Sequence, residues 1–243
     1  MGSTNGQIGV VSLLARYPVK SMRGEQLAAA EIDEQGIVGD RQWAVFTPDG
    51  GVGSGKSSRR FRRVEGLLDY RATLEGSGGP AGSAPLIESP TGQRFSADEP
   101  RASELLSAAL RRPLRLGQEP GVRHHDESGL HLVTTAALRG LSELLGETVE
   151  VARFRPNLVV ETPGDGFVED DWAGRELRLG ADVVVRLGTG MPRCVMVDLP
   201  QGELGADGRI LKMLGRERQL LFGLKVEVLH GGTVRQGDAA VLG

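Results

Sequence analysis

The order of apolar and polar positions along the chain predicts many short strands and few helices. Short apolar or β-branched runs, separated by Gly, Pro and polar residues, are typical of strands. The segments expected to form strands are 8–16, 27–32, 42–47, about 67–74, 157–161, 182–187, 193–198, 224–229 and 238–242. Because closing a sheet into a barrel removes its edge strands, this pattern favours a mainly β fold built from closed barrels.

A few short helices interrupt the strands. The segments with helical spacing of apolar residues and suitable end residues are 99–111, 135–145 and 208–214. Each has candidate end residues: Ser96 or Asp98 before the first, Thr134 or Thr135 before the second with Gly146 after it, and Asp207 and Gly215 around the third.

Three polar stretches divide these elements. Residues 48–63 are rich in Gly, Ser and Arg, and residues 76–85 have the low complexity of a loop. Residues 117–129 resemble a linker and suggest a boundary between two domains, 8–115 and 120–243. No internal repeat is visible.

Composition limits the classes of protein to which the chain can belong. It has 243 residues, 39% of them hydrophobic and 25% charged, which suits a packed globular protein. The net charge of −3 argues against a protein that coats nucleic acid. No signal peptide and no apolar run long enough to cross a bilayer is seen, so we expect a cytoplasmic protein without a membrane partner. The single cysteine, Cys194, excludes an intrachain disulfide and any cluster held by several thiolates.

The most conspicuous motif is misleading. Residues 50–57 (GGVGSGKS) match the phosphate-binding pattern G-x-x-x-x-G-K-[ST]. A true loop of this kind opens a helix, whereas the sequence that follows has no helical period and contains four arginines in five residues. A nucleotide triphosphatase is therefore the least favoured interpretation. A flexible hairpin loop, or an anion-binding loop in which Lys56 and Arg59–Arg63 face a phosphate, fits better.

Other polar residues lie where strands begin or end, which is a common place for ligand-binding groups. Lys20 and Ser21 follow the first strand, and Arg41 follows a tight turn. Each of these could equally be a solvated turn residue. Arg155 and Asn157 flank Pro156 before a strand and could face a polar heterocycle, although Asn157 could simply bond to backbone.

Two further motifs are candidates for metal chemistry. His124, His125 and Asp126 are adjacent, but adjacent side chains usually point apart, so an ordinary loop is the favoured reading. Cys194 follows a glycine-containing loop and stands next to Arg193, a cation that favours the thiolate form. A thiolate is a soft metal ligand, although buried cysteines are often inert.

Taken together, these segments resemble the MOSC family, which includes the C-terminal domain of molybdenum cofactor sulfurases and the amidoxime-reducing component. The resemblance covers nearly the whole chain. Residues 8–115, with YPVKS and GDRQW, resemble the N-terminal β-barrel domain of the family. Residues 120–243, with HLVTTAAL, FRPNLVV, the Arg-Cys pair and GTVRQGD in that order, resemble the MOSC domain. The resemblance therefore implies two β-barrel-like domains.

The resemblance also implies a molybdenum cofactor (molybdopterin) bound between the domains. Cys194 would be the thiolate ligand of the metal, and Asp126 would line the metal side as a second catalytic residue. The residues implied in cofactor binding are Lys20, Ser21, Arg41, Lys56, Arg59, Ser128, Thr134, Arg155, Asn157 and Cys194.

The activity implied is that of an oxidoreductase that removes oxygen from N-hydroxylated or related N–O compounds. One cysteine cannot hold an iron–sulfur cluster, so the electrons would come from a separate ferredoxin, flavoprotein or cytochrome b5-like donor. After the cysteine the chain reads VDLPQGELGADGR rather than the DPDTG type of the amidoxime reducers. The alternative is a non-catalytic carrier of the cofactor, or a protein that handles its sulfur.

Overall fold

Strands are the main regular elements of the fold, and the computed structural model describes residues 6–74, 83–119 and 121–243. The strands are β1 (Gln7–Arg16), β2 (Glu25–Gln26), β3 (Ala29–Asp33), β4 (Gly36–Ile37), β5 (Trp43–Phe46), β6 (Val52–Ser54), β7 (Phe61–Arg63), β8 (Arg71–Thr73), β9 (Leu86–Glu88), β10 (Arg94–Ser96), β11 (Arg115–Gln118), β12 (Leu130–Thr134), β13 (Leu158–Glu161), β14 (Glu176–Leu179), β15 (Val183–Pro192), β16 (Leu221–His230), β17 (Gly232–Arg235) and β18 (Ala239–Leu242). The α-helices within these ranges are α1 (Ala102–Ala109), α2 (Thr135–Leu145) and α3 (Ile210–Arg218). The prediction of a mainly β chain with a few short helices is confirmed.

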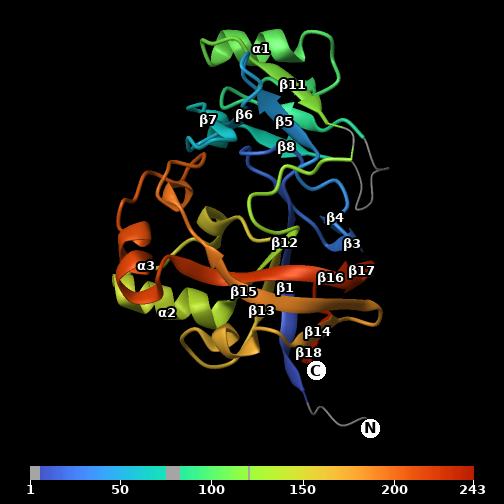
Figure 1. The fold of residues 1–243 in the computed structure, drawn as a ribbon, viewed down its shortest axis with the longest axis vertical. Coiled ribbons are helices and arrows are strands. Elements are labelled where there is room, and N and C mark those ends of the chain that lie inside the picture. The colour runs from blue at the N-terminus through green and yellow to red at the C-terminus, as the bar shows by residue number, and fades with distance from the viewer. Residues whose placement is uncertain (1–5, 75–82, 120) are drawn as a thin grey trace.

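Seven strands form a closed barrel in the lower part of the molecule (Figure 1). Their order is β13-β12-β16-β15-β14-β18-β1, and β1 closes the ring by pairing antiparallel with β13. Alternate residues point inward, such as Val183, Val185 and Leu187 of β15, and all three are fully buried. The barrel interior is therefore an apolar core of the kind that strand periodicity predicts.

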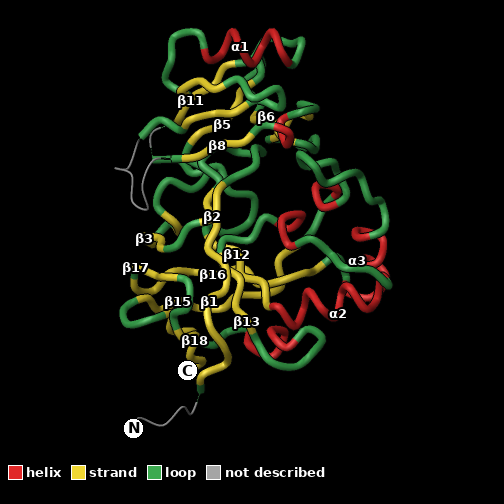
Figure 2. Tube along the Cα trace, turned by 180° about the vertical axis from the view of Figure 1, so that it is seen from behind, coloured by secondary structure: helices red, strands yellow, loops and turns green. Residues whose placement is uncertain are grey.

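The two longer helices α2 and α3 lie together on one side of this barrel, as both views show (Figures 1 and 2). Their apolar faces join Phe154 and Phe222 in a second core, in which the two rings stack at 4.2 Å between centroids. Helix α2 begins and ends as predicted: the Thr134 hydroxyl accepts a hydrogen bond from the Ala137 amide at 3.0 Å, and Gly146 has a φ of 73°.

The upper part of the molecule contains smaller sheets and helix α1. One sheet has the order β11-β5-β6-β7 and another β10-β9-β8. They enclose a separate apolar core that includes Trp43, Leu67, Ile87 and Leu106. The predicted boundary near residues 115–120 stays a prediction. Strand β1, which precedes it, belongs to the lower barrel, and β3 pairs with β17.

Several predicted elements differ from the structure. The strand expected over 193–198 is wrong: Cys194 is extended, and a 3₁₀ turn follows at Val195–Val197, because Val197 turns inward to join the core beside α3. The segment 67–74 is divided into a 3₁₀ turn, Leu67–Asp69, and strand β8. Residues 48–63 contain strands β6 and β7 rather than one flexible loop.

The helix ends differ as well. Helix α1 is shorter than predicted, and α3 continues through Gly215 to Arg218, where Gln219 takes the left-handed conformation that ends it. The predicted loop 76–85 lies mostly outside the described residues. No helix in the described ranges is long and apolar enough to cross a membrane.

A carboxyl group is buried beside the barrel core. Glu169 belongs to a 3₁₀ turn, Val168–Trp172, and is only 1% exposed. Its Oε2 accepts a hydrogen bond from the Thr134 hydroxyl at 2.8 Å, and Oε1 has no partner among the residues described. Burial raises the pKa of Glu169 to about 7.

Candidate functional site

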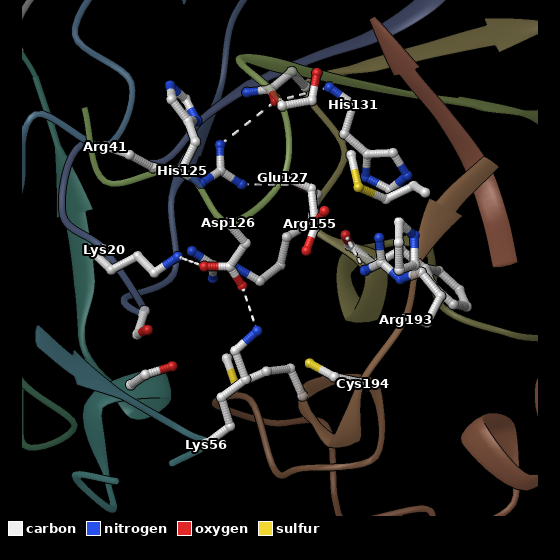
Figure 3. Close-up of a pocket in the computed structure, with 18 of the residues that line it drawn as sticks. Lys20, Arg41, Lys56, His125, Asp126, Glu127, His131, Arg155, Arg193 and Cys194 are labelled. Carbon is white, nitrogen blue, oxygen red and sulfur yellow. Dashed lines mark hydrogen bonds and ion pairs between the residues drawn. The ribbon is translucent and has the colours of Figure 1, made fainter. Parts of the chain in front are cut away.

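A polar cavity of about 160 Å³ lies where the upper sheets meet the lower barrel (Figure 3). It is lined by Lys20, Ser21, Arg41, Ser54, Lys56, His125, Asp126, Glu127, Ser128, His131, Arg153, Phe154, Arg155, Asn157, Met191, Pro192, Arg193, Cys194 and Met196. Nine of the eleven residues named as candidates from the sequence are in this set. Residues from widely separated parts of the chain are therefore brought to one place.

Lys20 and Ser21 enter the cavity from the turn that follows β1. The Lys20 amide donates to the Trp43 carbonyl at 2.8 Å, which fixes this turn against β5. Ser21 is 2% exposed and has a φ of 63°, which is unusual for a residue with a side chain. Its hydroxyl has no hydrogen-bond partner within the described part of the chain. A strained residue with an unsatisfied buried donor is typical of a binding site.

Asp126 lies between two lysines. One carboxylate oxygen pairs with Lys20, and the other accepts a hydrogen bond from Lys56 Nζ at 2.9 Å (Figure 3). Both ammonium groups also lie against the Phe61 ring, at 4.9 and 5.1 Å from its centroid. This ring and carboxylate therefore hold the two lysines together despite their like charges.

The protonation states of these three groups follow from their surroundings. Burial lowers the pKa of Lys20 to about 8, although Asp126 opposes the change. Burial alone would raise the pKa of Asp126, but Lys20 and then Lys56 outweigh it and hold that pKa well below its usual range. Near pH 7 the group is therefore two ammonium ions around one carboxylate.

Two arginines of the cavity lie against the same aromatic ring, that of Tyr17. The guanidinium carbons of Arg41 and Arg155 lie 4.7 and 4.3 Å from the centroid of Tyr17. Both residues have a positive φ, 50° and 52°. Arg41 is fixed by its ion pair with Asp40, which also accepts a hydrogen bond from the Tyr17 amide at 2.7 Å.

The Arg155 side chain is different, because neither of its terminal nitrogens has a partner in the described structure. Burial, and then the charge of Arg41, lower the pKa of Arg155 to about 10, so it stays protonated at neutral pH. A buried, charged and unpaired guanidinium costs free energy that an anionic ligand would recover.

Asn157 connects the barrel strands beside these arginines. Its amide donates to the Ala15 carbonyl at 3.1 Å, and its side-chain oxygen accepts from the His131 amide at 3.3 Å. Ser128 also has a structural bond, since its hydroxyl donates to the Val226 carbonyl at 2.9 Å. These two residues line the cavity and also fix its wall.

Cys194 closes the opposite wall, directly after β15. Its side chain is half-buried and lies beside Lys56 (Figure 3). The adjacent Arg193 donates to the Phe154 carbonyl at 2.8 Å and leaves its Nε without a partner in the described ranges. Burial lowers the pKa of Arg193 to about 10, and the Cys194 charge opposes this.

The protein alone does not form a metal cage here. Within residues 6–74, 83–119 and 121–243, no group of three or more His, Cys, Asp or Glu side chains is arranged to hold a metal ion. A metal bound by Cys194 would therefore need its remaining ligands from a bound molecule.

Two predicted site residues lie elsewhere. Arg59 is exposed and does not line the cavity. Thr134 is fully buried, where it caps α2 and donates to Glu169. The P-loop-like segment is also explained: residues 52–54 form strand β6, which pairs with β7, and no helix follows. Only Ser54 and Lys56 of this segment line the cavity.

Some lining residues were not predicted as site residues. His125 was interpreted as an ordinary loop residue, yet it lines the cavity, and burial lowers its pKa to about 4. His131, Arg153 and Arg193 also belong to the lining. Arg153 directly precedes the buried Phe154, and Arg193 directly precedes Cys194. An arginine beside a candidate site residue such as Cys194 is a signal by which these lining residues could have been predicted.

Comparison with known proteins identifies the family of the chain. The MOSC domain family matches residues 119–241, and the MOSC N-terminal beta barrel domain matches residues 8–83. The mitochondrial amidoxime-reducing component 1 of Xenopus laevis is 26% identical over 289 aligned positions, which cover 96% of this chain and 81% of the relative. The corresponding human protein is 24% identical over 285 positions, covering 97% and 83%.

A solved structure has the same fold. The YUAD protein from Bacillus subtilis is similar with a TM-score of 0.53 at 12% identity, over 98% of this chain and 97% of that one. The family match spans the half of the chain that contributes Asp126, Arg155 and Cys194 to the cavity. The chain therefore belongs to the MOSC domain family.

Proposed function

We propose that this protein binds the molybdenum cofactor in the cavity and reduces N-hydroxylated or related N–O compounds. The electrons would come from a separate ferredoxin, flavoprotein or cytochrome b5-like donor. Two findings support the proposal: the chain belongs to the MOSC domain family, and the two relatives are named amidoxime-reducing components.

The observation that carries the proposal is a set of buried polar atoms without partners around one thiol. Ser21 Oγ, both terminal nitrogens of Arg155 and Arg193 Nε have no partner among the described residues, and all three residues line the cavity with Cys194. Each such atom costs roughly 1–3 kcal/mol if it stays unsatisfied. A ligand with a phosphate and a polar heterocycle would satisfy them, and a pterin cofactor has both.

The residues fit distinct parts of that cofactor. Lys20, Ser21, Arg41 and Arg155 would hold the phosphate, since arginines bind phosphate with two parallel hydrogen bonds. Arg193 and Asn157 would face the pterin, and the Cys194 thiolate would bind the metal. When bound, the cofactor supplies a metal centre that exchanges two electrons with a substrate.

The lysine–aspartate group would have two uses. First, Lys20 and Lys56 both pair with the Asp126 carboxylate. A phosphate that enters the cavity would replace Asp126 as the acceptor of their hydrogen bonds. Replacing an N–O bond by an N–H bond, with release of water, consumes two electrons and two protons. Asp126 is held ionised and is a poor proton donor, whereas Lys20, with a pKa of about 8, is charged at neutral pH and can give up a proton.

The test is a metal and pterin analysis on protein from a host that makes the cofactor. Molybdenum would be measured by elemental mass spectrometry, and pterin by acid oxidation, in wild type and in Cys194→Ser. Val195→Ala is the matched control, because Val195 is the neighbouring residue and is 42% exposed.

We expect one molybdenum per chain in wild type and in the control, and loss of the metal in Cys194→Ser. The holoenzyme should reduce benzamidoxime with reduced methyl viologen. Equal molybdenum in Cys194→Ser would contradict the role of the thiol. Bound cofactor without any turnover would instead favour a carrier or sulfur-handling protein.

A further inference from the structure

A basic surface lies next to the cavity, and of its residues only Lys56 also takes part in the proposed cofactor site. We define the basic rim by its cationic residues, Lys56, Arg59, Arg60, Arg62, Arg63 and Arg112. Five of them fall within residues 56–63, a segment of eight residues that contains no Asp or Glu, in a chain whose net charge is −3. The positive charge is therefore strongly localised on β7 and the turn before it.

The rim is in direct contact with the cavity wall. Arg60 is exposed, yet its guanidinium donates to the His125 carbonyl at 3.4 Å, and His125 lines the cavity. Arg60 also lies 5.6 Å from the centroid of the Phe61 ring that holds Lys20 and Lys56. Arg112 continues the surface outward, because it donates to the Arg63 carbonyl at 2.7 Å.

Only part of this charge is neutralised. Arg62 pairs with Asp49 at 2.6 Å, and Arg63 with Glu65 at 2.9 Å. The Arg63 side chain is still 57% exposed in its pair, and Glu65 is 79% exposed. Such an exposed pair is weak, so Arg63 can exchange Glu65 for an acidic group of another protein. Arg62 is held more firmly, because it also donates to the carbonyls of residues 58, 59 and 61.

An apolar hollow lies between the rim and the loop that follows Cys194. It has a volume of about 290 Å³. Its lining combines the apolar residues Val64, Leu67, Leu68, Leu199 and Pro200 with Gly55, Gly66, Arg63, Glu65 and Asp69, and Glu65 is the ion-pair partner of Arg63. A Cβ at Gly55 would lie 2.5 Å from Met196 Sδ and 2.6 Å from Leu199 Cδ1, so the two loops touch here. An apolar centre with an arginine-rich border is the usual composition of a protein interface.

We infer that the basic rim and this hollow form the docking surface for a small acidic electron-transfer protein. The inference rests on the proposed function. Electron transfer between proteins requires the two redox centres to come close, so the donor must dock beside the cavity that contains Cys194. Arginine binds carboxylates with paired hydrogen bonds, and opposite charge speeds the encounter of the two proteins.

The two electrons needed for each N–O bond require the donor to dock on this surface more than once. A ferredoxin with one [2Fe–2S] cluster gives one electron at a time, whereas reducing one N–O bond takes two. Two reduced ferredoxins must therefore dock and be oxidised in turn for each product, with two protons taken up and one water released. A surface held together by exposed charges suits such repeated, short-lived contacts.

The experiment compares two electron donors on the cofactor-loaded enzyme. Benzamidoxime reduction is driven either by an acidic plant-type ferredoxin or by methyl viologen, a small molecule that needs no docking surface. The test variant is Arg63→Glu with Arg112→Glu. The matched control is Arg139→Glu with Arg178→Glu, which changes the net charge equally on exposed residues of α2 and β14.

We expect the test variant to have a kcat/KM for ferredoxin roughly tenfold or more below that of wild type at an ionic strength of about 0.02 M. The difference should shrink at about 0.5 M, where screening removes the electrostatic advantage of wild type. Rates with viologen should be unchanged in both variants. The milder Arg63→Gln with Arg112→Gln should lose less, and its molybdenum content and melting temperature show whether it is folded.

Three outcomes would overturn the inference. These are an unchanged rate with ferredoxin in the test variant, an equal loss in the control pair, and turnover with viologen but none with ferredoxin. Wild type that holds the cofactor but is inactive with viologen would refute the proposed reductase, which is a separate failure. Tight binding of a short DNA duplex that depends on Arg63 and Arg112, with unchanged ferredoxin kinetics, would assign the rim to nucleic acid instead.

Discussion

Replacing Glu169 by Gln should stabilise the protein at alkaline pH. Glu169 is 1% exposed, and its carboxyl has one hydrogen-bond partner, Thr134, within the described structure. Burial raises its pKa from 4.5 in the unfolded chain to about 7. Because the folded protein binds this proton more tightly than the unfolded chain does, stability is highest at low pH and falls as the pH rises from about 4.5 to 7.

The size of the effect follows from the change in pKa. A difference of about 2.5 units corresponds to roughly 3 kcal/mol of lost stability at pH 8, and to less than about 1 kcal/mol at pH 5. The glutamine side chain has the same shape as the protonated acid and cannot ionise. Glu169→Gln should therefore match wild type at pH 5 and be more stable by about 3 kcal/mol at pH 8.

Urea denaturation at pH 5, 6.5 and 8 measures this difference. Asp170→Asn is the matched control, since this neighbouring carboxylate is half exposed and pairs with Arg218 at 2.5 Å. The control should change stability by less than about 1 kcal/mol. If Glu169→Gln is no more stable than wild type at pH 8, or keeps the same pH dependence, the pKa of Glu169 is not raised in the folded protein.

Two other predictions concern the cavity and the barrel. Binding of inorganic phosphate to the cofactor-free protein, measured by calorimetry, should weaken above pH 8, because Lys20 loses its proton there. The variant Lys20→Met should not show this pH dependence, whereas the control variant Lys212→Met, at an exposed residue, should keep it. Phosphate affinity that is constant between pH 7 and 9.5 in wild type would exclude Lys20 from the anion site. Gly223→Ala should cost at least about 2 kcal/mol of stability, because its φ is 71° and a Cβ would lie 2.5 Å from the Leu132 carbonyl oxygen. Gly164→Ala, with a φ of 78° and open space around it, should cost only about 1–2 kcal/mol in the same urea experiment, and equal losses would show that the close contact does not matter.

The elements that could be predicted from the sequence are those fixed by local signals. Helix α2 has its bounds because Thr134 caps it and Gly146 ends it, and both act within one turn. The barrel strands follow from alternation, since residues such as Val183 and Val185 bury every second side chain. The strand predicted over 193–198 was wrong because Val197 in this segment is buried against α3, a contact that strand periodicity cannot reveal.

The site residues, too, divide into those that local sequence signals indicate and those that depend on contacts between distant segments. Lys20, Arg41, Arg155 and Cys194 line the cavity, and they could be named in advance because strand ends and a family resemblance point to them. The bridge between Lys20, Asp126 and Lys56 could not be found, because its partners are 106 and 70 residues apart in the sequence. Arg59 lies outside the cavity lining, and its role stays a prediction; the direction of a side chain in the turn before β7 depends on the pairing of β6 with β7, which the sequence does not reveal.

The closure of the barrel by β1 has a consequence during synthesis. Val10 of β1 pairs with Ala239 of β18, so β1 needs a strand that is made much later to complete its hydrogen bonds. At about 5–20 residues per second, roughly 10–50 s pass before that partner exists. In this time β13, which is made earlier, can pair with one edge of β1, but the other edge of β1 lacks its partner. The barrel therefore stays open between β1 and β18 until β18 has been made, and the open edge of β1 is exposed to pairing with a wrong strand.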